Sequence, residues 1–68
     1  MSEYHCFFLD AADQVAATVT IRSRTEAEAQ THADNILAAS NHAGVEIWIG
    51  GRSLYRSRKP VFYPGALG

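Results

Sequence analysis

Apolar and polar residues alternate along two segments of the chain. In residues 15–22 a valine, an alanine, a second valine and an isoleucine occupy every second position, and two threonines and an arginine lie between or after them. In residues 45–49 a valine and two isoleucines alternate with a glutamate and a tryptophan. Because successive side chains of a strand point to opposite faces, this period of two predicts two half-buried strands. The expected inward side chains are Val15, Ala17, Val19, Ile21, Val45, Ile47 and Ile49.

Two further segments complete a hairpin with each of these strands. Residues 4–9 are rich in aromatic side chains and apolar on both faces, over a length that favours a strand. The aspartates that follow them suit a loop of about five residues into the first alternating strand. Gly50 and Gly51 follow the second alternating strand, and both accept the positive φ of a two-residue hairpin turn. Residues 52–57 are therefore the expected return strand.

One helix is expected between the two hairpins. Thr25 and Glu28 have the spacing of a capping box, in which the hydroxyl accepts from a helical amide and the carboxylate reaches back. Ser23 offers the same motif two residues earlier, so the sequence leaves two possible starts. Gly44 suits the end of the helix. The face that shows amphipathic spacing consists of Ala29, Ala33, Ile36, Leu37 and Ser40.

The order strand, strand, helix, strand, strand predicts one α+β domain over residues 1–59. We expect a ββαββ layout, a four-stranded, mainly antiparallel sheet with one helix on one face. Residues 60–68 are expected to form a C-terminal tail, partly packed or disordered. A right-handed crossover allows the strand order 2-1-3-4 or 1-2-3-4. We favour 2-1-3-4 because it puts the most apolar strand, residues 4–9, in the centre.

The short chain needs a source of stability beyond its own core. With 68 residues, it buries only about 60% of the surface that its unfolded chain exposes, and proteins of this size usually add a disulfide, a metal or a partner. Cys6 is the only cysteine, so no disulfide forms within the chain. A lone cysteine, and a start without a basic region and an apolar run, favour the cytoplasm. No stretch approaches the roughly 18 apolar residues of a membrane span.

Charge is divided unevenly along the chain. Residues 1–46 carry seven acids and two arginines, whereas residues 47–68 carry four bases and no acid. Such a basic segment suits the phosphates of RNA or single-stranded DNA, with aromatic residues stacking on bases. It also suits an edge strand kept soluble by cations, and the overall pI of about 6.2 lies below the value of roughly 9 that is usual for a nucleic-acid-binding domain. The candidate nucleic-acid contacts are Arg52, Arg56, Arg58 and Lys59.

Metal binding is not expected from the spacing of the metal-competent residues. His5 and Cys6 are neighbours on a strand, so their side chains point to opposite faces and do not share an ion. His32 and His42 are ten residues apart, and no CxxC or HxxxH spacing exists. We therefore expect no metal and no cofactor.

A catalytic site is not expected either. A catalytic nucleophile needs a base beside it, and Cys6 on a central strand is typical of a buried, unreactive thiol. Asp10 and Asp13 lie in a loop, where aspartates normally stabilise turns. A chain this short also has difficulty enclosing a substrate pocket of roughly several hundred Å³. We interpret the protein as non-enzymatic.

Four short stretches resemble a known group of bacterial proteins. These stretches are Phe7-Phe8-Leu9-Asp10, Glu28-Ala29, Val45-Glu46-Ile47-Trp48 and Gly51-Arg52. Over residues 4–56 the chain is similar to short uncharacterised domains of alphaproteobacteria. The resemblance implies a hairpin–helix–strand layout and a bacterial cytoplasmic setting, and it implies no activity. The loop after Asp10 departs from the group because it lacks the glycine expected there.

One face of the predicted sheet is expected to stay open. A single helix covers only one face, and the outward side of the strand at residues 45–49 carries Trp48. Contiguous apolar surface of this kind usually marks an interface, and Trp is over-represented among the residues that dominate interface energy. The expected interface residues are Phe7, Leu9, Trp48 and Leu54, the last of which alternation places on one face with Arg52 and Arg56.

Two kinds of cover suit this open face. Residues 61–63 fold back over it, or two chains pack there as a two-fold dimer. We favour the homodimer because it also adds stability to a short chain; an unidentified protein partner is a further option. The leading hypothesis is thus a small interaction module, and weak nucleic-acid binding through the basic segment is the alternative.

Overall fold

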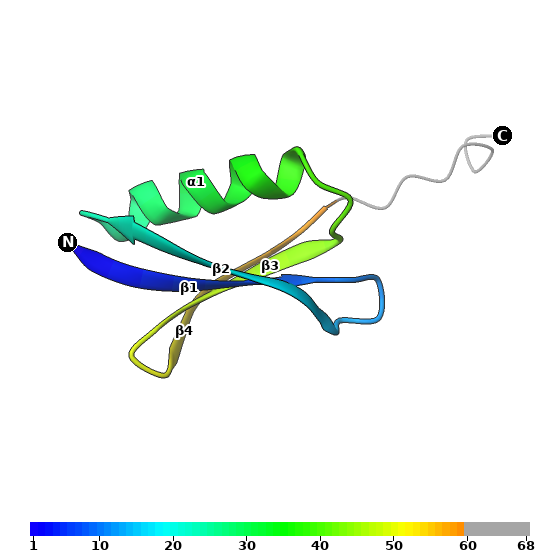
Figure 1. Cartoon of the computed structure of the whole chain (residues 1–68), viewed down its shortest axis with the longest axis horizontal. Helices are drawn as coiled ribbons and strands as arrows, with labels where there is room; N and C mark the ends of the chain where they lie inside the picture. Colours follow the sequence, from blue (N-terminus) through cyan, green and yellow to red (C-terminus); the bar gives the residue numbers. More distant parts are fainter. Residues whose placement is uncertain (60–68) are drawn as a thin grey trace, which may run out of the picture.

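Over the residues that the structure describes, four strands and one helix make up the fold (Figure 1). The computed structural model describes residues 1–59. All three strand pairs are antiparallel and the sheet order is β2-β1-β3-β4, which confirms the α+β ββαββ layout and the favoured strand order. The expected tail, with residues 61–63, lies outside the described residues. In chain order the elements are β1 (Ser2–Leu9), β2 (Val15–Ser23), α1 (Glu26–Ala38), β3 (Gly44–Ile49) and β4 (Arg52–Arg58).

The helix begins at the second of the two expected caps. Thr25 has extended backbone dihedrals, and its hydroxyl accepts a hydrogen bond from the Glu28 amide at 3.1 Å. The Glu28 carboxylate reaches back to the amide of Arg24 at 3.3 Å. At the other end α1 stops at Ala38, so Ser40 lies beyond the helix and not on its face as expected. Within the described range, no helix is long and apolar enough to cross a membrane.

The hydrophobic core lies between α1 and one face of the sheet, on the side where Figure 1 shows the helix. Cys6 of β1 is central to it, since it pairs with Val19 of β2 and with Ile47 of β3. Phe8 is 1% exposed, and full burial of such a side chain contributes about 1.5–3 kcal/mol. The buried cluster consists of Tyr4, Cys6, Phe8, Ile21, Ala29, Ala33, Leu37, Val45 and Ile47.

A bulge at the start of β2 turns Val15 away from the core, where its spacing in the sequence placed it. Phe8 pairs with Ala17 and Leu9 pairs with Val15, so Ala16 is an extra residue opposite the β1 strand. An extra residue shifts the alternation by one and sends the next side chain to the other face. Val15 is therefore 58% exposed and not inward as its spacing predicts.

A second register shift, between β3 and β4, places Leu54 on the helix side of the sheet. Ile47 pairs with Tyr55 and Trp48 pairs with Ser53, which leaves Leu54 as the extra residue. Leu54 is half-buried and packs against the core cluster on the helix side. The expectation that it shares the open face with Trp48 is wrong, because the register shift interrupts the alternation on which it rested.

Candidate interaction surface on the open sheet face

The face of the sheet opposite α1 carries a groove of about 290 Å³. Phe7 and Trp48 alternate along β1 and β3 with core residues, so their side chains point away from the helix. Their rings meet edge to face, with centroids 6.4 Å apart and planes at 84°, an arrangement that aromatic pairs favour. We call this region the open-face groove; it is lined by Phe7, Leu9, Val15, Glu46 and Trp48.

The chain itself shelters the groove unevenly. Leu9 is only 5% exposed, whereas Val15 is 58% exposed. Phe7 and Trp48 are half-buried. Apart from Met1, Val15 is the one large apolar side chain of residues 1–59 that is mostly open to solvent. The groove therefore presents apolar surface to water mainly at its Val15 end and along its two aromatic rings.

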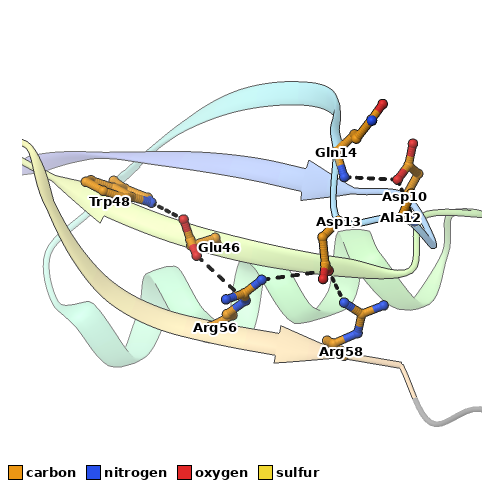
Figure 2. A network of polar contacts seen from close by, with 8 residues as sticks. All are labelled: Asp10, Ala12, Asp13, Gln14, Glu46, Trp48, Arg56 and Arg58. Carbon is orange, nitrogen blue, oxygen red and sulfur yellow. Dashed lines mark hydrogen bonds and ion pairs between the residues drawn. The ribbon is translucent and has the colours of Figure 1, made fainter.

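A chain of polar contacts runs from the groove to the loop between β1 and β2 (Figure 2). The Trp48 Nε1–H donates to Glu46 Oε1 at 2.5 Å, and Glu46 Oε2 lies 3.7 Å from the Arg56 Nε. An Arg56 Nη is 3.7 Å from the carboxylate of Asp13. Arg58 makes an ion pair and hydrogen bond to the same carboxylate. Two acids thus alternate with two arginines along one side of the groove. We call these four residues, Asp13, Glu46, Arg56 and Arg58, the rim of the groove.

The loop that carries Asp13 is held by its own hydrogen bonds. One carboxylate oxygen of Asp10 accepts from the amides of Ala12 and Gln14 at 2.8 and 3.0 Å. Asp13 has φ +63°, the left-handed conformation that glycine adopts most freely. Aspartate is one of the few residues with a side chain that also tolerates this conformation. Its side chain then reaches β4, which a glycine has no means to do.

The four basic residues proposed as nucleic-acid contacts do not share one surface. Arg56 and Arg58 face the open side and pair with acids. The Lys59 Nζ donates to the backbone carbonyl of Ser40, just after α1. Arg52 pairs with the last residue of β3, which packs against the core, so it belongs to the helix side of the sheet. The ion pairs and this dispersal leave little of the basic surface that a phosphate backbone requires.

The side chains considered above as metal ligands or nucleophiles lie apart from one another. Cys6 is fully buried, while the neighbouring His5 is exposed on the other face, 3.4 Å from the Thr20 hydroxyl. The His42 ring lies against Phe8, with centroids 5.3 Å apart. Burial raises the pKa of the Cys6 thiol, which favours its neutral, less nucleophilic form. In the part of the chain that the structure describes, no three His, Cys, Asp or Glu side chains are grouped to hold a metal ion.

The structure thus brings three of the four expected interface residues into one groove and replaces the fourth. Phe7, Leu9 and Trp48 line the groove, and Val15 takes the place of Leu54. Sequence reasoning missed Val15 because the bulge at Ala16 leaves no break in the alternation. It also missed the link from Asp13 to β4, for which the missing glycine in the loop was the available signal. No protein-family model, curated protein or solved structure matches this chain.

Proposed function

We propose that this protein is a small non-enzymatic interaction module that forms a homodimer through the open-face groove. The observation that carries the proposal is the position of Val15, Phe7 and Trp48 on the sheet face that α1 leaves uncovered. Apolar and aromatic residues at the centre of a polar rim are the usual composition of a protein interface. A non-enzymatic role agrees with the separation of the nucleophilic and metal-competent side chains.

A second copy of the chain suits this surface better than other partners. A two-fold interface brings a patch against itself, so each charge must meet an opposite charge on the same patch. The rim meets this condition because it holds both acids, Asp13 and Glu46, and both arginines, Arg56 and Arg58. A dimer also adds buried surface to a domain that is too short to bury much of its own. Self-association is therefore the occupant that we propose.

We assign this role to a reducing compartment, the bacterial cytoplasm. The basis for a reducing compartment is Cys6, a free and buried thiol in a chain with no second cysteine, and the bacterial setting is what the resemblance over residues 4–56 implies. Proteins with an unpaired buried cysteine are typical of compartments that keep thiols reduced.

Sedimentation equilibrium of the full chain tests the proposal. The wild-type protein is expected to pass from monomer to dimer over the micromolar range. The substitution V15K puts a charge at the most exposed groove position and is expected to weaken the dimer by about tenfold or more, the scale of an interface hot spot. T31K adds the same charge on the exposed outer surface of α1 and is the matched control, expected to leave the dimer unchanged.

Each other outcome has a defined meaning. A wild-type chain that is monomeric at high micromolar concentration contradicts the homodimer. If truncation after Lys59 then exposes Trp48 to solvent, residues 61–63 are the cover in place of a second copy. If V15K and T31K weaken the dimer equally, the contact lies elsewhere on the molecule.

A further inference from the structure

The outer edge of β2 is a surface that the groove does not use. β2 is an end strand of the sheet, so every second backbone amide and carbonyl along it points outward, and none of the described strands pairs with them. It has 9 residues, more than any other strand of the structure. Its residues 16, 18 and 20 are exposed, and Ala17 and Val19 pack against the core yet stay half-buried. The core is thus left open along this edge.

The two edges of the sheet differ in charge. β4 carries three arginines among its 7 residues, and positive charge on an edge strand opposes pairing with another copy. β2 carries no charge from Val15 to Ile21 and no proline. The bulge at Ala16 and the charge of Arg22 limit the part of this edge that is available for pairing with another strand. A five-residue segment, 17–21, therefore remains unprotected and rich in β-branched residues, which favour sheet formation.

The geometry points to antiparallel pairing of β2 with β2 of a second copy of this chain. The uncharged segment is centred on Val19, so a two-fold axis there sets Thr18 opposite the partner's Thr20 and Ala17 opposite the partner's Ile21. Threonine pairs and aliphatic pairs directly across two strands are stabilising. A second copy fits because the segment is its own complement in this register, with no charge to repel. The half-buried Ala17 and Val19 gain cover on the same side as the core.

This pairing gives the assembly a definite shape. The two-fold axis is perpendicular to the sheet, so both helices lie on one side of a continuous eight-stranded sheet. Both open-face grooves then lie on the other side. The inference goes beyond the proposed function, since it uses backbone groups of residues 17–21, whereas Val15, the groove residue of β2, lies on the other side of the bulge at Ala16. A chain that uses both surfaces forms assemblies larger than a dimer.

Amide hydrogen exchange followed by NMR on the full-length protein tests the pairing directly. The outward amides of β2, which are every second residue in the segment 17–21, are expected to exchange roughly tenfold or more slowly as protein concentration rises from low to high micromolar, since pairing satisfies them. The outward amides of β4 are the internal control and are expected to keep their rates. Exchange of the β2 amides that does not depend on concentration overturns the inference.

Charge variants provide an independent test by sedimentation. T18K/T20K and T18E/T20E each place like charges directly across the proposed pair, so each variant alone is expected to lose the edge pairing and to form nothing larger than the groove dimer. An equimolar mixture of the two is expected to restore the edge pairing. T31K/N35K, on exposed positions of α1, controls for net charge, and circular dichroism checks that each variant folds. If the mixture associates no better than its components, the pairing is absent.

Hydrogen exchange of the β2 amides and sedimentation of V15K together separate this inference from the groove dimer. If the groove dimer alone exists, V15K weakens association but the outward β2 amides show no dependence on concentration. If the edge pairing alone exists, those amides become protected and V15K leaves the association unchanged.

Discussion

Asp13 has a left-handed backbone conformation and also makes long-range ion pairs. Its backbone φ is +63°, in the left-handed region. Residues other than glycine, asparagine and aspartate adopt this conformation only at an energetic cost. Its carboxylate also contacts Arg56 and Arg58, forty-odd residues away in the chain. The residue therefore ties the first hairpin to the last strand across the open face. Neither property follows from its loop position alone.

Substitution at position 13 separates these two properties. D13N keeps a residue that tolerates the left-handed conformation and removes the ion pairs, which are about half exposed. We expect it to lower the free energy of unfolding by less than about 1 kcal/mol, because exposed pairs are screened. D13A is expected to cost a further 1 kcal/mol or so through its backbone. Urea unfolding at low and high salt measures both effects, and salt should abolish only the first. An equal cost for both variants at every salt concentration contradicts this separation.

Cys6 makes stability depend on pH at the alkaline end. Burial raises the pKa of its thiol above the ordinary value of 9.0. Well below pH 9 the thiol is neutral in both folded and unfolded chains, so its contribution is constant. As pH rises from 9 through the folded-state pKa, the unfolded chain releases the proton first, and the folded state loses stability.

Chemical unfolding between pH 8 and 11 tests this role of Cys6. The free energy of unfolding of the wild type is expected to fall more steeply above pH 9 than that of C6A, although C6A is less stable at pH 8 because it leaves a small cavity. The comparison with C6A isolates the contribution of the Cys6 thiol. Parallel profiles for the two proteins refute the role.

At the scale of the elements, the cap of α1 is a local feature with a measurable weight. The Thr25 hydroxyl accepts from the Glu28 amide, which is otherwise an unpaired helical donor. T25A is expected to lower the free energy of unfolding by about 1 kcal/mol, whereas T25S keeps the acceptor and should cost only a few tenths. Thermal unfolding of both variants measures the difference. Equal losses for T25A and T25S would show that the methyl packing, and not the cap, matters.

The sequence predicted the elements well because their signals are local. Alternation placed the strands, the capping motif placed the helix, and the Gly50-Gly51 turn has positive φ at both residues as expected. Even the strand order followed from centring the most apolar strand. The expected helical position of Ser40 is wrong because α1 ends at Ala38. The other errors, the faces of Val15 and Leu54 and the shared face of Arg52 and Arg56, arise at register shifts, where one extra residue reverses the face of its neighbours. A shift of this kind depends on the partner strand, so the alternation of a single strand contains no sign of it.

At the scale of the whole molecule, charge pairing favours a protein partner over nucleic acid. Arg56 and Arg58 of β4 form ion pairs with acids of the rim. Arg52, at the start of β4, lies on the other face of the sheet. We expect no binding of single-stranded DNA or RNA oligonucleotides at low salt, measured by fluorescence anisotropy. An affinity that is measurable at low salt and falls steeply as salt rises would instead support phosphate contacts.

The central claim is that a second copy of the chain covers the open face around Trp48. Trp48 is the only tryptophan, so its fluorescence emission reports directly on that face. We predict that the emission maximum shifts to shorter wavelength as protein concentration rises through the micromolar range, in the wild type and in T31K but not in V15K. An emission maximum that is the same at every concentration in all three proteins would contradict the claim.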